Sequence, residues 1–431
     1  MLSSHLNKLK VMFWLIEIEN QLNVLKSSSY RDAFIEVIPY SYNTHSSQND
    51  ICAVYIRPLD ATKGFMLPIS HSETLLLDID KIKHVINKFD AVYVRDRKEF
   101  LNYYQNKNTF DISTPPNPPY IRELTQCHQF YYNTYQDLGD INRIIPIVKH
   151  YEMCEAMFES LKGNIPKEIN KFYNTKTTLV FNHIERNGLK VNRDKFQTTF
   201  HNIKEDLVYT EYNFKTLTGR PSNIFRGINY GAINKKNGDR EIFIPRNDKM
   251  VELDIGAYHP TLLAKLTGYT FPPGDIHESF SEMYGVDYQK AKEITFKQMY
   301  GGIWKEYRDL EFFKRAQEYI DSLWQKFQEE GFVECPISKH RFEKSALNDM
   351  NPQKLLNYLL QNLETSLNVC IMWDIIKILK DKNTKLVLYT YDAFLFDLDR
   401  NEKNEFKQIQ ELFKDRGLNT KLSYGDTYNF E

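Results

Sequence analysis

Two aspartates set in apolar runs are the residues whose surroundings point most directly to chemistry. Asp254 lies in the run VELDI (Val251–Ile255), and Asp392 lies inside KLVLYTYDAFLFDL (Lys385–Leu398). An aspartate after a strand is ordinarily a turn or helix-cap residue, so neither one is informative alone. Two carboxylates that buried strands bring to one place could instead hold a pair of Mg²⁺ ions, as metal-dependent phosphoryl transfer requires.

The segment between these aspartates predicts a helix with a chemically mixed face. In AKEITFKQMYGG (Ala291–Gly302), Lys292, Phe296 and Tyr300 are four residues apart and therefore share one face of a helix. The lysine could neutralise a phosphate, and the two rings could pack on a sugar or a base. An aromatic stripe at helical spacing is more often part of a core, so this pattern is weak by itself.

The elements that must position these residues fall into two parts. Residues 1 to about 160 alternate strands near Val11–Ile18, Ile51–Arg57 and Ala91–Val94 with a helix near Ile82–Phe89. Later residues show mainly helical periodicity, and the run around Tyr391 and Asp392 predicts a β-hairpin with the carboxylate at its turn. The pattern indicates an α/β part followed by an α+β part.

Composition indicates a folded protein of several domains and gives no indication of its binding partner. A chain of 431 residues with 42% hydrophobic residues folds into more than one domain, and its net charge of -1 gives no indication of nucleic acid. The 5 cysteines form no CxxC pair, which argues against a zinc ribbon or disulfide framework and favours a reducing cytoplasm. The apolar run Val11–Ile16 is too short to span a bilayer and predicts a buried strand, so no membrane partner is expected.

From Lys171 to Glu431 the chain resembles the polymerase region of family A DNA polymerases, the class of bacterial DNA polymerase I and its phage relatives. The segments that carry the resemblance, in chain order, are NHIERNGLKVN (Asn182–Asn192), TGRPS (Thr218–Ser222), LDIGAYHPTLLAKLTG (Leu253–Gly268), GDIHESFSEMYGV (Gly274–Val286), Ala291–Gly302, LLNYLLQNLETS (Leu355–Ser366) and LYTYDAFLFDL (Leu388–Leu398). Family B polymerases have a first motif similar to DIGAYHPTLL. The spacing from Lys292 to Gly301 is that of family A. The Asp-Thr-Asp turn of family B does not occur at Asp392, so the resemblance to family A is favoured.

The resemblance implies a role for each matched position. Asp254 and Asp392 would be catalytic metal ligands together with the backbone carbonyl of Ile255. The triphosphate and base-pair pocket would be formed by His277, Lys292, Phe296, Tyr300, Tyr258 and His259. Primer-template contacts would come from Arg220, Asn357, Gln361 and Arg341.

Four positions depart from the family pattern. Tyr288 stands where the family has an arginine, so one phosphate charge is missing or comes from Lys290 or another residue. Tyr391 and Ala393 flank Asp392 where the family has a histidine and a second carboxylate, leaving two metal-binding carboxylates. His259 replaces the glutamate that excludes a ribose 2′-hydroxyl, and its bulk still favours deoxynucleotides.

The resemblance also implies domain boundaries. A right-hand polymerase at 161–431 would have a reduced thumb at about 171–218, a palm at about 219–270 and 350–431, and fingers at about 271–349. Residues 1–160 would be an RNase H-like 3′-5′ exonuclease domain. The short span from Glu185 to Arg220 suggests low processivity without a partner.

The exonuclease motifs are matched only loosely. IEIEN (Ile16–Asn20) resembles the first motif with Glu17 and Glu19, and YEMCEAM (Tyr151–Met157) resembles the last with Tyr151 and Glu155. In the middle motif Phe100 stands where a metal-binding aspartate belongs. Replacing one ligand by Phe and lengthening others should destroy two-metal geometry, so the sequence predicts a degenerate, inactive exonuclease.

The function expected from these residues is template-directed addition of deoxynucleotides to a primer 3′ end. Its cofactors would be two Mg²⁺ ions, with Mn²⁺ as a substitute, and its partners primer-template DNA, dNTPs and a processivity factor or other replisome proteins. The high Asn, Lys and Tyr content indicates an AT-rich genome, such as that of a virus of bacteria, and the protein would then replicate viral DNA in the host cytoplasm. Open alternatives are an RNA polymerase or primase with relaxed sugar selection, a catalytically silent DNA-binding relative, and a nuclease centred on Glu17, Glu19 and Glu155.

Overall fold

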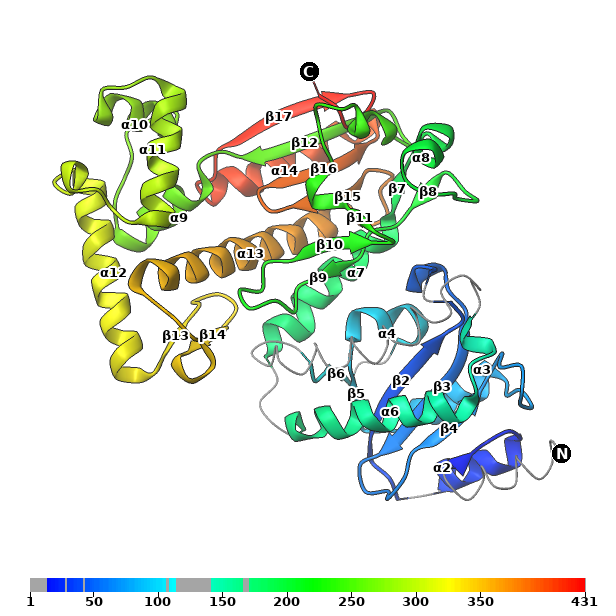
Figure 1. The fold of residues 1–431 in the computed structure, drawn as a ribbon. Coiled ribbons are helices and arrows are strands. Elements are labelled where there is room, and N and C mark those ends of the chain that lie inside the picture. The colour runs from blue at the N-terminus through cyan, green and yellow to red at the C-terminus, as the bar shows by residue number, and fades with distance from the viewer. Residues whose placement is uncertain are drawn as a thin grey trace. The chain divides into compact units, whose positions relative to one another are not determined.

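The structure, a computed structural model, describes residues 14–27, 29–41, 43–105, 108–113, 141–165 and 170–430. The chain forms two compact units, Met1–Asn182 and His183–Glu431, which are described separately (Figure 1). The predicted domain boundary near residue 160 lies inside the first unit, at the end of helix α6 (Ile147–Leu161). Cys127 and the Val11–Phe13 part of the predicted first strand lie outside the described residues.

The first unit contains a mixed sheet with strand order β1-β4-β3-β2-β5-β6. Strand β2 pairs antiparallel with β3 and parallel with β5, so it lies inside the sheet, whereas β1 lies at an edge. The strands are β1 (Trp14–Leu15), β2 (Asp32–Pro39), β3 (Ile51–Pro58), β4 (Phe65–Pro68), β5 (Ala91–Val94) and β6 (Thr109–Asp111).

Side chains of alternate strand residues build a core on each face of this sheet. One face packs against α3 (Ile79–Ile86) and α4 (Arg97–Tyr103), and the other packs against α6. Phe34 belongs to the α6 core and Ile35 to the opposite one, as the period of a strand requires. The short helix α2 (Asn23–Ser27) contributes Leu25 to the α3 side. The predicted α/β pattern is therefore present, although α3 begins and ends three residues before the predicted helix.

The second unit is built on an antiparallel sheet of order β15-β16-β12-β17 (Figure 1). Its strands are β12 (Lys249–Ile255), β15 (Lys385–Thr390), β16 (Ala393–Leu398) and β17 (Thr420–Gly425). The long helix α13 (Pro352–Ile378) and α14 (Lys403–Asp415) contact each other, and Phe394 of β16 packs edge-on against Phe413 of α14. The two predicted aspartate-bearing strands are confirmed as β12 and the β15–β16 hairpin.

A group of helices follows strand β12. They are α9 (Tyr258–Thr267), α10 (Ile276–Tyr284), α11 (Tyr288–Gly301) and α12 (Glu311–Glu330). Phe271, Phe280 and Phe312 form mutual ring contacts at centroid distances of 5.1–5.3 Å, which join α10 to α12. Such aromatic contacts stabilise helix packing beyond the area they bury. Helix α11 packs against α10 and α13, so its position is defined by neighbours on both sides.

Short elements occupy the region predicted to form a reduced thumb. They are α7 (Thr178–Asn187), β7 (Leu189–Lys190), α8 (Arg193–Thr199), β8 (Leu207–Val208) and β9 (Tyr212–Asn213), and β9 pairs with β10 (Ser222–Phe225), which also pairs with β11 (Ile228–Asn229). A separate hairpin of β13 (Phe332–Glu334) and β14 (Arg341–Glu343) follows α12.

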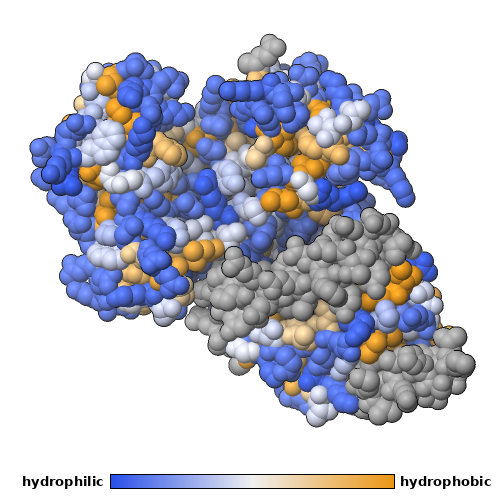
Figure 2. Space-filling view, in the orientation of Figure 1, coloured by the Kyte–Doolittle hydropathy of each residue, from blue (hydrophilic) through white to orange (hydrophobic). Residues whose placement is uncertain are grey.

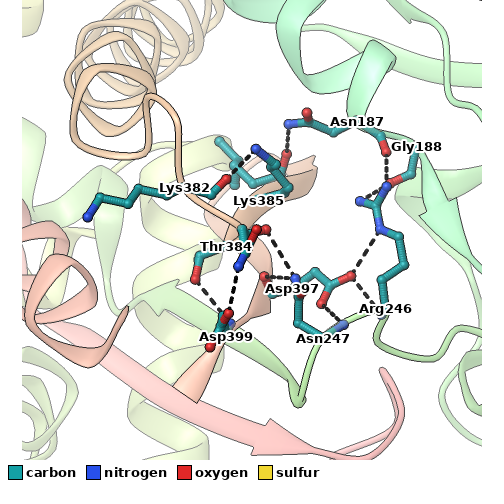
Figure 3. Close-up of polar contacts among 11 residues, drawn as sticks. Asn187, Gly188, Arg246, Asn247, Lys382, Thr384, Lys385, Asp397 and Asp399 are labelled. Carbon is teal, nitrogen blue, oxygen red and sulfur yellow. Dashed lines mark hydrogen bonds and ion pairs between the residues drawn. The ribbon is translucent and has the colours of Figure 1, made fainter. Parts of the chain in front are cut away.

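A buried polar network stabilises the sheet at the end far from its aspartate turn (Figure 3). Asp397 of β16, 1% exposed, accepts hydrogen bonds from the backbone N–H groups of Arg246 and Asn247 at 2.8 and 2.9 Å. The Arg246 guanidinium also reaches the carbonyls of Asn187 and Gly188. Because Arg246 and Asn247 lead into β12, the network holds β12 and β16 in register.

The face of the molecule in Figure 2 is mostly hydrophilic, with hydrophobic residues in small groups. In the described part of the chain, none of the helices combines the length and the apolar character needed to cross a bilayer.

Candidate active site

The second unit contains a pocket of about 790 Å³ that brings together most of the predicted site residues. Its lining includes Asp254, Ile255, Tyr258, His259, His277, Lys292, Phe296, Tyr300, Asp392 and Arg220. These residues come from β12, α9, α10, α11, the β15–β16 turn and the segment before β10. Residues separated by more than a hundred positions thus share one cavity.

Backbone pairing places the two aspartates. Asp254 lies opposite Ala393 in the β12–β16 ladder, and the Ile255 N–H donates to the carbonyl of Asp392 at 2.9 Å. Tyr391, with φ of 59°, turns the hairpin through the left-handed region, which is uncommon for a residue other than glycine. The hairpin turn and the end of β12 are therefore adjacent, and both carboxylates line the pocket.

The pocket has an acidic wall. Burial, followed by Asp392 and Glu252, raises the pKa of Asp254 to about 6, while Lys235 and Lys292 act in the opposite direction. Partial burial and Glu364 also raise the pKa of Asp392. Burial is the main cause of these shifts and the neighbouring carboxylates add to it; a cation bound beside the carboxylates would favour their ionised form.

The predicted mixed face of α11 is present and faces the acidic wall across the pocket. Lys292 is exposed, and Phe296 is 63% exposed with its ring centroid 4.5 Å from that of Tyr300. An exposed phenylalanine beside a lysine is a surface for a flat ligand rather than a core stripe. The helix ends as predicted, because Gly302 adopts a φ of 108°.

The end of the pocket that was predicted to bind phosphate has a different set of charges from the one expected. His277 packs edge-on against Tyr288 at 5.8 Å, and burial together with Lys292 lowers the pKa of His277. Lys290 does not line the pocket and is paired with Glu293 at 3.3 Å, so it does not replace the missing arginine. Lys235 and Lys421 line the pocket instead.

His259 is held between two polar side chains. Its Nε2 lies 2.6 Å from Glu364 Oε2, and its Nδ1 lies 2.7 Å from the Tyr300 hydroxyl. The neighbouring Tyr258 is 5% exposed and donates to Asn368 Oδ1 at 2.7 Å. His259 is therefore an ordered wall of the pocket.

The residues predicted to contact primer-template are not all in one place. Arg220 and Gln361 line a second, more open pocket of about 310 Å³, and the Thr218 hydroxyl donates to Gln361 at 3.2 Å. Asn357 donates to the Tyr300 carbonyl at 3.4 Å. Arg341 lies in the β13–β14 hairpin, pairs with Glu334 at 3.0 Å and lines neither pocket.

Five charged residues of the main pocket were missed in the sequence: Glu252, Asp275, Glu364, Lys235 and Lys421. Strand alternation could have found Glu252, because it lies two residues before Asp254 and shares its face. Lys421 is opposite Asp254 only through the pairing of β12 with β17, which no local pattern indicates.

The first unit does not gather the predicted exonuclease residues into a site. Glu17 follows β1, which is at an edge, and Glu19 begins a short helical turn (Glu19–Leu22), so within the described residues the strand predicted near Val11–Ile18 covers only Trp14–Leu15. Phe100 is 3% exposed in the core. Among the described residues, no group of three or more His, Cys, Asp or Glu side chains has the geometry for a metal ion.

Tyr151 and Glu155 are engaged in a hydrogen-bonded cluster. One Glu155 oxygen accepts from the Tyr55 hydroxyl at 2.7 Å, the Gly64 N–H at 2.8 Å and the Tyr151 hydroxyl at 2.9 Å. Arg57 lies 3.9 Å from the same oxygen. The cluster satisfies this carboxylate oxygen within the protein.

Strand β2, inside the sheet of the first unit, carries a buried carboxylate, Glu36. Glu36 is 5% exposed, and Arg95 donates to it at 2.9 Å and also to Glu99 at 2.9 Å. Burial raises the pKa of Glu36 to about 7, although Arg95 opposes the shift. A guanidinium thus neutralises the acidic group at this position.

No protein-family model matches the sequence, and no curated protein matches it. The structure is similar to the solved POL domain of Pol1 from M. smegmatis in complex with DNA primer-template and dNTP. The TM-score is 0.63 at 13% identity, over 96% of this chain and 98% of that chain. The mixed α/β fold is therefore that of a polymerase domain.

Proposed function

We propose that this chain is a template-directed DNA polymerase of the family A type, which adds deoxynucleotides to a primer 3′ end. The observation that carries the proposal is the pocket in which Asp254 and Asp392 share space with Lys292, Phe296 and Tyr300 of α11. The polymerase-like fold and the ordered motifs between Asn182 and Leu398 support it independently.

The donor set of the pocket suits Mg²⁺. This ion is bound in phosphoryl-transfer sites by one or two carboxylates, with substrate phosphates and water completing the shell. Asp254 and Asp392 would hold it together with the Ile255 carbonyl, and Mn²⁺ would fit the same hard oxygen ligands. Bound there, two ions would lower the pKa of the attacking hydroxyl and neutralise charge on the phosphates.

The protein's own residues would position the nucleotide. Lys292 and His277 would bind the triphosphate, since both line the pocket. Phe296 and Tyr300 would pack on the base and sugar, and Tyr288 in place of an arginine predicts weak triphosphate binding. Lys235 and Lys421 offer the additional positive charge from the sheet side.

The setting of His259 favours deoxynucleotides. Both of its ring nitrogens already have partners, so its exposed edge offers no hydrogen bond to a ribose 2′-hydroxyl. A pocket that leaves a substrate hydroxyl without a partner disfavours that substrate. The ring would then act as a wall beside the sugar.

The remaining parts would serve the polymerase. We propose that the second unit has palm, fingers and a reduced thumb, and that primer-template DNA runs past Arg220, Gln361 and Asn357. The short elements between Glu185 and Arg220 predict low processivity without a partner such as a replisome protein. The first unit would be an inactive, exonuclease-like scaffold.

Primer extension with the purified full chain tests the proposal. With Mg²⁺ and a primer-template, dNTPs should extend the primer, and Asp392→Ala should abolish extension. The matched control is Asp415→Ala, which removes an exposed carboxylate at the end of α14, outside the pocket, and should leave extension intact.

Other outcomes identify the alternatives. Extension by rNTPs without a primer would show an RNA polymerase or primase. Binding of primer-template without any extension would show a silent DNA-binding relative. Shortening of the primer that depends on Glu17, Glu19 or Glu155 would show a nuclease.

A further inference from the structure

Glu364 is a buried carboxylate at the wall of the main pocket. It lies in the middle of α13, is 2% exposed, and has polar partners from two other parts of the second unit, His259 of α9 and Arg220 before β10. Burying a carboxylate is costly unless it is paired and hydrogen-bonded. An apolar residue at the same position would avoid this desolvation cost. The groups that pair with Glu364 therefore indicate its role.

One oxygen of Glu364 orders a chain of hydrogen bonds that ends on α11. A carboxylate only accepts, so His259 Nε2 carries the proton and donates to Glu364 Oε2 over 2.6 Å. In the neutral ring Nδ1 is then an acceptor, and the Tyr300 hydroxyl donates to it over 2.7 Å. Glu364 thereby selects the tautomer and the ring orientation that bind Tyr300.

The second oxygen of Glu364 faces the aspartate turn. Arg220 Nη2 lies 3.4 Å from Glu364 Oε1, and the Arg220 guanidinium carbon lies 4.0 Å from the centroid of the Tyr391 ring. Tyr391 immediately precedes Asp392. A single carboxylate thus connects the last turn of α11 with the turn that carries a predicted metal ligand.

We propose that Glu364 is a positioning residue for nucleotide binding, which acts through His259 on Tyr300 and so fixes the face of α11 that receives the nucleotide. The proposal rests on the proposed polymerase function. It does not require Glu364 to touch the substrate, because both of its oxygens face protein groups.

The geometry predicts which kinetic constant responds. Phe296 and Tyr300 are in ring contact, so loss of the Tyr300 anchor would free both rings at the nucleotide end of the pocket. Asp254 and Asp392 are placed by the main-chain pairing of β12 and β16, and Glu364 reaches their turn only indirectly, through Arg220 and the Tyr391 ring. The KM for the nucleotide should therefore rise more than kcat falls.

A double-mutant cycle in single-nucleotide incorporation tests this. Glu364→Gln removes the charge and keeps the shape, and Tyr300→Phe removes only the hydroxyl. Each should raise the KM for dNTP by about tenfold, the size of one strong hydrogen bond, because each breaks the same chain from Glu364 to Tyr300. The double variant should be no worse than either single one, since both break the same chain of bonds.

Matched controls separate positioning from general damage. Glu364→Gln combined with His277→Gln should give the product of the two single effects, because His277 is on α10 and is not among the bonds of Glu364. If Glu364→Gln does not fold, His259→Gln takes its place in the cycle with Tyr300→Phe. Independent effects of Glu364 and Tyr300, or a wild-type KM in Glu364→Gln, would overturn the proposal.

Failure of the proposed function can be recognised separately. If the wild-type chain incorporates no nucleotide, the polymerase assignment is wrong, and the same cycle is measured in the midpoint of urea unfolding. Non-additive midpoint shifts would still support coupling between Glu364 and Tyr300. Additive shifts would overturn it.

Discussion

The backbone N–H of Ile255 donates to the carbonyl of Asp392 at 2.9 Å. This bond extends the β12–β16 ladder by one step past the pair Asp254 and Ala393. The two carboxylates are therefore brought together by main-chain pairing rather than by side-chain contacts. No basic side chain among the described residues forms a direct salt bridge with either carboxylate, so a cation could stabilise the pair.

The first prediction concerns cation binding and pH. The folded pKa of Asp254, about 6, lies above the ordinary value of 3.8, so the folded state binds the extra proton between these values. This group's contribution to stability is present below the ordinary value and is lost as pH rises through about 6. Mg²⁺ should therefore raise the thermal midpoint more at about pH 7.5 than at about pH 5, as measured by thermal unfolding.

Asp254→Asn is the control for this effect. It removes the charge without shortening the side chain, so it should raise the midpoint of the metal-free protein at neutral pH. It should also remove most of the shift that Mg²⁺ causes. An equal Mg²⁺ shift at both pH values would contradict the prediction.

The second prediction concerns the opposite end of the sheet. Asp397→Ala leaves the Arg246 and Asn247 N–H groups without their acceptor (Figure 3). The expected loss is about 2–4 kcal/mol of unfolding free energy, below that of a fully buried pair because Arg246 is partly exposed. Urea unfolding followed by tryptophan fluorescence measures it, since Trp304, Trp324 and Trp373 are all in the second unit.

Asp399→Ala provides the matched control. Asp399 is two residues further along, is half-buried, and caps the short turn Arg400–Glu402 by accepting from the Asn401 N–H at 2.9 Å. Losing such a cap costs about 1 kcal/mol. Equal losses for the two variants would show that burial of Asp397 does not matter.

The parts of the site that could be predicted from sequence are those with a local pattern. The alternation around Asp392 predicted the hairpin, and the four-residue spacing of Lys292, Phe296 and Tyr300 predicted the face of α11. Glu364 could not be found in this way, because its role depends on His259, more than a hundred residues earlier. A buried carboxylate in a helix looks the same in sequence as an exposed one.

In the first unit, the local pattern did not indicate where each strand lies in the sheet. The apolar run Val11–Ile16 predicted a buried strand, and Leu15 and Ile16 are buried, but the order of strands cannot be read from one run, and β1 (Trp14–Leu15) lies at the edge of the sheet. Strand β2, inside the sheet, was not predicted, and it carries Glu36. Periodicity indicates which face a residue occupies and does not indicate its place in the sheet.

The third prediction concerns a close approach in the first unit. A Cβ on Gly64 would lie 2.2 Å from a ring carbon of Tyr55, which is 0% exposed and has little space to move. Gly64→Ala should therefore displace the ring, break its bond to Glu155 and cost about 1–3 kcal/mol, as overpacking does. Hydrogen exchange of β3 and β4 amides measures the loss where it occurs.

Gly163→Ala serves as the comparison, because a Cβ there meets nothing within 4 Å. It should leave exchange in β3 and β4 unchanged. A similar effect of the two substitutions would mean that the contact with Tyr55 is not the cause.

The last prediction is the absence of proofreading. Glu155 is held by Tyr55, Gly64 and Tyr151, Phe100 lies in the core, and Arg95 neutralises Glu36, so a metal ion would have to displace existing partners. A mismatched primer should therefore keep its length in the absence of dNTPs, by gel analysis of the wild-type chain. Glu19→Ala should change nothing, because Glu19 is exposed and is 3.8 Å from Lys81. Primer shortening that Glu19→Ala abolishes would show instead that the first unit assembles a metal site when DNA binds.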